Sequence, residues 1–566
     1  MDLPLKQWIA QLANGISPAS LAQAQSDWLV HLLVSPAKQA ELSASALRKS
    51  LAWWLALVSS EHDAQADEAM ARQDRRFAHK EWAEPPFDAM ARAFLSAQQW
   101  WEEATHGVRG VSKHHEDQVA FVARQWLDML SPSNFVATNP EVLKRTLTTG
   151  GANLANGFVN WARDAVTVAG NGKARGVEDF LPGQAVALTP GKVVMRNELA
   201  ELIQYEPATA TVLREPVFIV PAWIMKFYIL DLTPQDSLVK YLIENGHTVF
   251  IVSWRNPRSE QAGLGMEDYV RRGVLDSLAT IRSLYPKTGI HAAGYCLGGT
   301  LLAIAAALPE CRDVLRTLTL FAAQTDFSEP GELGLFMDES QVAFLEDLMT
   351  ENGYLDGRRM AGAFQLINSK DLVWSKLVHE YLMGATTPMT ALRAWNADAT
   401  RMPARMHAEY LRHLYLRNDL AEGRFCCTSR DPVDLSRIKV PMFAVATERD
   451  HVSPWKSVYR VHRLVDSDID FVLTSGGHNV GIVNPPQGPA AHAAASYRQM
   501  HHAAHQAPAE PDDWLAGAQR FQGSWWPAWT HWLREHSSGE TAARAVRSVT
   551  IDGRIVPAPG AYVRES

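Results

Sequence analysis

The sequence predicts an α/β fold in which a mostly parallel sheet carries the functional residues and a mainly helical domain precedes it. Three observations support this prediction. From about residue 200, short apolar runs typical of strands alternate with helical segments. One strand-to-helix turn, at residues 294–299, reads Gly-Tyr-Cys-Leu-Gly-Gly. Two polar residues that can assist a nucleophile, Asp450 and His478, each follow a later predicted strand.

The helical N-terminal domain is predicted over residues 1–200. Apolar residues recur at helical spacing in residues 27–34 and 121–130. Two polar stretches, residues 59–73 and 105–118, are expected to be loops.

The catalytic domain is predicted over residues 201–566, with a cap inserted at about 322–438. Its principal strands are expected at 216–220, 290–293, 316–321, 441–446 and 471–474. More than a hundred residues without a clear strand separate the third of these from the fourth, and we expect them to cover the site. Residues 487–513, rich in Ala, Pro and His, are expected to be an irregular surface excursion.

Cys296 occupies the centre of a nucleophile elbow, a motif in which serine is the more usual residue. The nucleophile of this motif sits on a strained turn, and its neighbours two positions away must be small so that strand and helix can approach. Gly294 and Gly298 meet this requirement. An apolar strand precedes the turn and an apolar helix at 300–308 follows it. Cys296 is therefore predicted to project above the C-terminal edge of the sheet.

The chain order of nucleophile, acid and histidine is that of the alpha/beta-hydrolase fold. Cys296 precedes Asp450, which precedes His478. Because a free thiol is mostly protonated at neutral pH, the imidazole would take its proton, and the carboxylate would hold the imidazole tautomer. The backbone amide of Leu297 and one from the loop Ala222–Trp223 are expected to bind the oxyanion.

The remaining cysteines and histidines are expected to have structural or surface positions. Cys311 fits a buried apolar site, and the adjacent cysteines at 426–427 fit neither a zinc site nor a simple disulfide. His451 follows the acid directly and is either a second group that supports it or a neighbour without a role. The histidines at 501–505 lack the cysteine or carboxylate spacing of a metal site, so no metal is expected.

Composition and charge restrict the partners and the cellular compartment of the protein. A net charge of −8 over 566 residues, without a basic run, argues against a nucleic-acid partner. Four cysteines without framework spacing indicate a reducing compartment. The first residues do not resemble a signal peptide and no apolar run approaches transmembrane length, so a cytoplasmic protein is expected.

Several long motifs resemble those of polyhydroxyalkanoate synthases, the polymerases that make bacterial storage polyester, and class I enzymes above all. The similar segments are residues 221–232, 246–257, 294–299, 371–374, 395–400, 450–455, 477–486 and 523–529. The resemblance covers roughly residues 74–563. It implies that Cys296 is the acylated nucleophile, that His478 is its base and that Asp450 is the third member.

The resemblance implies a transferase that uses (R)-3-hydroxyacyl-CoA, such as the short-chain 3-hydroxybutyryl-CoA, and needs no cofactor. The acyl group would pass to Cys296 with loss of CoA, and a 3-hydroxyl group would then attack the thioester. Whether His478 or Asp450 takes the proton of that hydroxyl stays open, and the resemblance favours a part for Asp450. The alternatives are a thioesterase or intracellular polyester depolymerase, and a non-catalytic granule-surface protein.

The resemblance also implies a homodimer at the surface of cytoplasmic polymer granules. The apolar residues 51–58 are a candidate for contact with the granule, but we favour a buried helix there because apolar helical runs usually belong to a core. Two residues depart from the family pattern. Met225 stands where class I enzymes have asparagine, and Asn479 follows His478 where an apolar residue is more usual.

Overall fold

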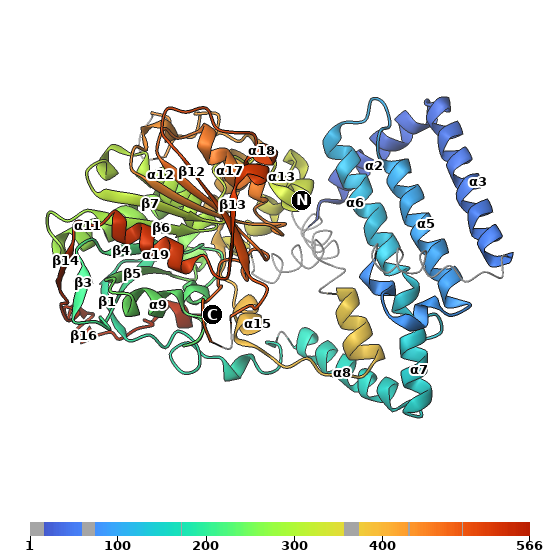
Figure 1. Cartoon of the computed structure of the whole chain (residues 1–566), viewed down its shortest axis with the longest axis horizontal. Helices are drawn as coiled ribbons and strands as arrows, with labels where there is room; N and C mark the ends of the chain where they lie inside the picture. Colours follow the sequence, from blue (N-terminus) through green and yellow to red (C-terminus); the bar gives the residue numbers. More distant parts are fainter. Residues whose placement is uncertain are drawn as a thin grey trace. The chain divides into compact units, whose positions relative to one another are not determined.

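The computed structural model describes residues 16–58, 74–170, 172–355, 373–427, 431–488 and 491–565, which form two units (Figure 1). The helical unit contains the described residues of 16–174 together with 373–388. The α/β unit contains those of 175–355 and 389–565. Within the described residues, none of the helices combines the length and apolarity that crossing a membrane would take.

The division between the units falls near residue 174 and not at the expected residue 200. Residues before 200 already belong to the sheet, because the strand β1, Gly191–Arg196, pairs antiparallel with β2, Ala200–Tyr205. The preceding segment is also attached to this unit, since Ala187 N–H donates to Asp231 O at 2.9 Å. Residues 373–388, inside the expected cap, group with the helical unit instead.

The helical unit is built from amphipathic helices. They are α2 (Pro18–Leu33), α3 (Pro36–Val58), α5 (Phe87–Thr105), α6 (Lys113–Met129), α7 (Pro140–Thr148), α8 (Ala152–Ala169) and the π-helical η11 (Leu377–Leu382). A small core forms around Phe77, Trp82 and Phe94. Ser112 accepts from His115 N–H and caps α6, so the loop expected at 105–118 is limited to 106–112. The loop expected at 59–73 lies outside the described residues.

The last two turns of α3 are exposed, so the prediction of a buried helix at 51–58 is wrong. Leu51, Trp54, Leu55 and Val58 are between half and two-thirds exposed. These positions recur at three- and four-residue spacing and so share one face of the helix. Helical spacing identified the helix correctly, but it did not show whether a partner covers the apolar face.

The α/β unit contains a ten-stranded sheet with the order β1-β2-β5-β4-β6-β7-β10-β11-β12-β13. Beyond β1 and β2, its strands are β4 (Val217–Val220), β5 (Val249–Trp254), β6 (Ile290–Tyr295), β7 (Leu315–Phe321), β10 (Met442–Thr447), β11 (Ile469–Thr474), β12 (Ser496–His502) and β13 (Gln519–Gln522). The six strands from β5 to β11 are parallel, and the outer pairs are antiparallel. This arrangement confirms the predicted fold class, in which the C-terminal ends of the parallel strands meet at one edge.

Helices connect and cover the parallel strands. They are α9 (Leu238–Glu244), α10 (Met266–Asp268) with the π-helical η7 (Tyr269–Leu275), α11 (Asp276–Leu284), α12 (Leu297–Ala306), α17 (Trp455–Tyr459), α18 (Pro511–Gly517) and α19 (Trp526–Glu535). The insertion at 322–438 contributes α13 (Glu339–Met349), α15 (Ala391–Asn396), α16 (Ala404–Tyr410), the π-helical η12 (Leu411–Leu416) and the paired two-residue strands β8 (Tyr354–Leu355) and β9 (Met402–Pro403). Short ribbons join β3 (Thr211–Leu213) to β14 (Glu540–Ala542), and β15 (Thr550–Ile551) to β16 (Arg554–Ile555).

Residues 487–513 are more regular than their composition predicted. They include β12, which pairs antiparallel with β11 along its whole length, and the start of α18. The strand forms because the edge of the sheet supplies backbone partners, which overrides the weak strand preference of its residues.

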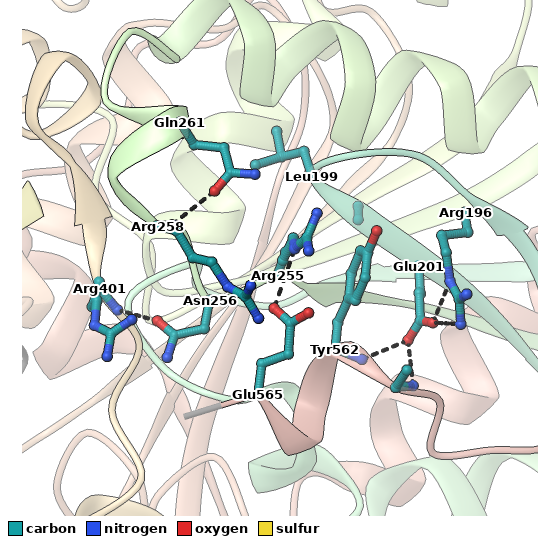
Figure 2. Close-up of polar contacts among 12 residues, drawn as sticks. Arg196, Leu199, Glu201, Arg255, Asn256, Arg258, Gln261, Arg401, Tyr562 and Glu565 are labelled. Carbon is teal, nitrogen blue, oxygen red and sulfur yellow. Dashed lines mark hydrogen bonds and ion pairs between the residues drawn. The ribbon is translucent and has the colours of Figure 1, made fainter. Parts of the chain in front are cut away.

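The C-terminal segment is fastened to the sheet by buried charge (Figure 2). The Glu201 carboxylate, on β2 and fully buried, accepts from Arg196 Nε at 2.8 Å and from the N–H groups of Ala561 and Tyr562 at 2.9 and 3.0 Å. Arg255, just after β5, lies over the Tyr562 ring at 5.0 Å. One buried carboxylate therefore holds both an arginine and the end of the chain.

We expect Glu201→Gln to lower the free energy of unfolding by about 3 kcal/mol, because it removes the buried carboxylate that pairs with Arg196 and accepts from two backbone N–H groups. It should also increase amide exchange over residues 556–565, which lose their anchor. Urea denaturation and hydrogen exchange measure the two effects. The matched control is Glu540→Gln, whose half-exposed pair with Arg534 should contribute less than about 1 kcal/mol. Equal losses in the two variants would contradict the anchoring role.

Candidate active site

Cys296 lies on a strained turn between β6 and α12. Its backbone has φ 54° and ψ −128°, a conformation that non-glycine residues rarely adopt. Its N–H donates to Phe321 O at 2.8 Å, which ties the turn to the neighbouring strand β7. A Cβ on Gly294 would collide with the backbone of Gly299, and one on Gly298 with the Val220 carbonyl. The small residues predicted from the motif are therefore required by close backbone approach.

The three predicted catalytic residues come together at the C-terminal edge of the sheet. His478 Nδ1 lies 2.7 Å from Asp450 Oδ2, and Cys296 is near enough to the His478 ring for its charge to raise the pKa of the imidazole. With Nδ1 engaged by the carboxylate, Nε2 is the nitrogen left for the thiol. The histidine therefore bridges acid and nucleophile, which is the arrangement needed for proton transfer from sulfur.

Every hydrogen-bonding direction of the Asp450 carboxylate is used. Oδ1 accepts from the N–H groups of Val452 and Ser453 at 2.9 and 2.8 Å. Oδ2 accepts from Thr447 Oγ1 at 3.0 Å in addition to His478. The side chain has no exposed surface. These contacts hold the carboxylate in place and leave it no free oxygen for a substrate.

The site favours the charged pair of carboxylate and imidazolium. Burial raises the pKa of Asp450, but the charge of His478 and the hydrogen bonds outweigh it and hold this pKa below the usual range. Burial likewise lowers the pKa of His478, yet the charges of Asp450 and Cys296 raise it well above 6.5. A protonated His478 is the state that follows removal of the thiol proton, and the Asp450 carboxylate stabilises that imidazolium.

The oxyanion loop, residues 221–226, follows β4 and crosses the first turn of α12. The Pro221 carbonyl lies so close to Gly298 that a Cβ there would overlap it. Ala222 and Trp223 are buried, and the N–H groups of both residues and of Leu297 have no hydrogen-bond acceptor among the described residues. Unpaired buried amides beside a nucleophile are suited to bind a developing negative charge.

Sequence reasoning missed a group of tyrosines around the nucleophile. Tyr295 OH donates to Asn479 Oδ1 at 2.6 Å, and its ring lies 5.5 Å from that of His478. Asn479, a departure from the family pattern, thus has a partner next to the catalytic histidine. Tyr410 and Tyr415 come from the insertion, and burial together with the nearby Cys296 raises the pKa of both. No local motif marked these two residues, because they reach the site only through tertiary folding.

The other residues singled out from the sequence lie apart from this constellation. The His451 side chain is exposed and makes no hydrogen bond or ion pair within the part of the chain that the structure describes, so nothing supports its role beside Asp450. Cys311 is buried, which raises the pKa of its thiol to about 12. His501 and His502 are adjacent on β12 and therefore point to opposite faces of the sheet. His505 pairs with Asp466 at 2.8 Å.

Three family models match the chain, from its first residues through its centre to residue 485. A family model described as "Poly-beta-hydroxybutyrate polymerase (PhaC) N-terminus" matches residues 73–242, and one described as "Poly-beta-hydroxybutyrate polymerase N terminal" matches residues 1–38. A third, described as "alpha/beta hydrolase fold", matches residues 215–485.

Full-length relatives match as well. The chain is 41% identical to the "Poly(3-hydroxyalkanoate) polymerase" of Methylorubrum extorquens, over 87% of this chain and 80% of the relative. It is 38% identical to the "Poly(3-hydroxyalkanoate) polymerase subunit PhaC" of Rhizobium etli, over 87% and 77%. It is 34% identical to the protein of the same description from Cupriavidus necator, over 99% of this chain and 94% of the relative.

The charge balance of the site predicts how His478 titrates. In the parent enzyme its imidazole should titrate above 6.5, and in Asp450→Asn at a clearly lower pH, because burial then acts without the opposing carboxylate. NMR of histidine-labelled protein, assigned with His478→Gln, measures both values. Since the folded pKa is the higher one, protonation of His478 stabilises the fold fully below about pH 6.5, and this contribution is lost as pH rises through the folded pKa. Unchanged titration in Asp450→Asn would show that the carboxylate does not control the histidine.

Proposed function

This chain belongs to the poly(3-hydroxyalkanoate) polymerase family, and we propose that it makes polyester through a covalent acyl thioester on Cys296. It is an acyltransferase, with an acyl-CoA as substrate and a polyester as product. One observation carries the assignment of the nucleophile. Cys296 stands on the strained elbow close to His478, whose Nδ1 lies 2.7 Å from Asp450 Oδ2.

The first half-reaction transfers the acyl group to the enzyme. His478 Nε2 accepts the thiol proton, and the Cys296 sulfur attacks the thioester carbonyl of (R)-3-hydroxyacyl-CoA. The carbonyl oxygen becomes an oxyanion that the N–H of Leu297 and an N–H of the oxyanion loop bind. The bond between carbonyl carbon and CoA sulfur then breaks. CoA sulfur takes the proton from His478 and leaves, so that the acyl group remains on Cys296.

The second half-reaction extends the polymer. The 3-hydroxyl of another monomer or of the chain end attacks the Cys296 thioester, and the bond between carbonyl carbon and sulfur breaks as the new ester forms. We assign the proton of this hydroxyl to His478 and an orienting role to Asp450. Each oxygen of the Asp450 carboxylate already accepts two hydrogen bonds, and the side chain is fully buried, which favours action through the histidine.

Exclusion of water separates a polymerase from a thioesterase, because water in the site would hydrolyse the acyl enzyme. Cys296 is only 7% exposed. Tyr410 and Tyr415, both from the insertion, are buried near the thiol. We assign the part of the insertion that belongs to the α/β unit and carries these tyrosines as the cap that keeps the thioester dry. The bulky side chains of these tyrosines and of Trp223 beside the nucleophile favour a short acyl chain, such as 3-hydroxybutyryl.

Single-turnover mixing with labelled 3-hydroxybutyryl-CoA tests the covalent step and the role of Asp450. The parent enzyme should release one burst of CoA and gain the mass of one acyl group, whereas Cys296→Ala should do neither. If Asp450 only orients His478, Asp450→Asn should lower the burst rate by about 100-fold or more, because the imidazole loses its tautomer and its charge partner. Quenched-flow assays and intact-protein mass spectrometry measure burst and adduct. An Asp450→Asn protein that acylates at the parent rate and then stalls would instead assign the hydroxyl proton to Asp450.

Exposed apolar residues on two helices of the helical unit support a second part of the proposal, association with the polymer granule in the cytoplasm. On α3 they are Leu51, Trp54, Leu55 and Val58. On α8, Phe158, Trp161, Val166 and Val168 are more than half exposed as well. Large exposed apolar patches mark interaction sites, and the family's product is an apolar solid of matching chemistry. The family resemblance also implies a homodimer, which offers a competing use for such a face.

Charged substitutions on α3 distinguish these uses. The double variant Trp54→Glu and Leu55→Lys should reduce binding to polyester granules at least tenfold, while CoA release from dissolved substrate stays within twofold of the parent. Co-sedimentation with granules and a CoA-release assay measure these two effects, and sedimentation velocity of the free protein measures the dimer. Leu147→Lys, at an isolated exposed residue of α7, is the control for added charge. Granule binding that persists while a dimer dissociates would assign this face to the dimer.

A further inference from the structure

The backbone carbonyls of the oxyanion loop are held from outside by side chains and backbone of two other segments. Trp254 Nε1, at the end of β5, donates to Pro221 O at 2.8 Å. The other donors come from the insertion. Thr400 Oγ1 donates to Trp223 O at 2.6 Å, Thr400 N–H donates to Ile224 O at 3.0 Å, and Trp395 Nε1 donates to Lys226 O at 2.7 Å. Carbonyls at both ends and in the middle of this short loop are therefore fixed.

These contacts also orient the amides of the loop. A peptide unit is planar, so the direction of one carbonyl sets the direction of the next residue's N–H. Trp254 fixes the plane that carries the Ala222 N–H. Thr400 fixes the peptide that joins Trp223 to Ile224. The Trp223 N–H belongs to the peptide before it, which lies between the two fixed peptides. The Ala222 N–H is thus aimed by the hydrogen bond to the carbonyl of its own peptide, and the Trp223 N–H by the fixed peptides on either side of it.

Thr400 is itself held in place. It is fully buried between α15 and β9. On one side of it, the Asp398 carboxylate accepts from Tyr228 OH at 3.0 Å, and on the other, Arg401 N–H donates to Asn256 Oδ1 at 3.0 Å. Figure 2 shows Asn256, just after β5, next to Arg401. The threonine hydroxyl is consequently anchored to the same edge of the sheet from which Cys296 projects.

We propose that Thr400 and Trp395 are positioning residues of the oxyanion hole. Through them the insertion holds the second oxyanion donor, the N–H of Ala222 or Trp223, in line with the Cys296 thioester. The inference deepens the proposed function and rests on acylation of Cys296. In this proposal, residues 395–400 both cover the site and orient a donor to the oxyanion. Without the threonine hydroxyl, the peptide after Trp223 is free to rotate, and the preceding amide loses its direction.

The test compares Thr400→Val, which keeps shape but removes the donor, with Thr400→Ser, which keeps the hydroxyl. The burst of CoA from 3-hydroxybutyryl-CoA should slow about 10- to 100-fold in Thr400→Val, with little change in KM, and by no more than about threefold in Thr400→Ser. Alkylation of Cys296 by iodoacetamide should keep the parent rate in both variants. This displacement at a saturated carbon uses the same thiol but forms no oxyanion.

Two further variants keep the test decisive if Thr400→Val fails to fold. Trp395→Phe removes the donor to Lys226 O and should slow the burst without slowing alkylation, including when Thr400→Val does not fold. Thr530→Val removes a buried hydroxyl that donates within α19 to Trp526 O at 3.1 Å, and it should change neither rate. Burst rates at the parent level in Thr400→Val and Trp395→Phe would overturn the inference.

Parallel losses of burst and alkylation would also overturn it, because they would indicate a general disturbance of the elbow. Failure of the proposed function looks different. A parent enzyme without a burst that depends on Cys296 would refute the acyl-enzyme itself, and the role of Thr400 with it. A parent burst that neither variant alters refutes only the positioning role.

Discussion

At the C-terminal edge of the sheet, the Pro221 carbonyl passes so close to Gly298 that any side chain there would collide with it. This contact brings the oxyanion loop against the first turn of α12, one residue beyond the amide of Leu297. It also makes the strained turn at Cys296 part of a packed assembly, since Gly294 and Gly299 approach each other on its other side. The geometry of nucleophile and oxyanion donors depends on these backbone contacts, for which only glycine leaves room.

The charged residues of the site depend on the same packing. Burying a carboxylate and an imidazolium costs free energy unless each is well paired. Asp450 accepts four hydrogen bonds, and His478 lies between two groups that favour its protonated form. The buried pair is therefore stable only when β10, β11 and the elbow after β6 are assembled. A thiol alone on an elbow would lack the base that activates it.

The insertion supplies more than a cover. Tyr410 and Tyr415 bring aromatic surface to the thiol, and Thr400 holds the oxyanion loop. Residues 373–388 of the same insertion group with the helical unit and not with the α/β unit. One continuous stretch of sequence thus contributes to both units. The helical unit, in turn, leaves apolar faces exposed on α3 and α8, a feature suited to a protein whose product is an insoluble polymer.

The sequence by itself determined the features that follow from local rules. The alternation of strands and helices indicated the sheet, glycine spacing located the elbow at Cys296, and the chain order pointed to Asp450 and His478 as its neighbours. The fold and the positions of these residues agree with the structure because steric and periodic constraints act between residues that are close in the chain.

Tertiary structure decided what depends on contacts between distant segments. It turned residues 496–502 into a strand by pairing them with β11, moved the unit boundary to near residue 174, and left the apolar face of α3 exposed. It also brought Thr400 to the carbonyl of Trp223, 177 positions away in the chain. No local pattern encodes such a contact, because its free energy comes from a hydrogen bond that exists only after both segments have packed.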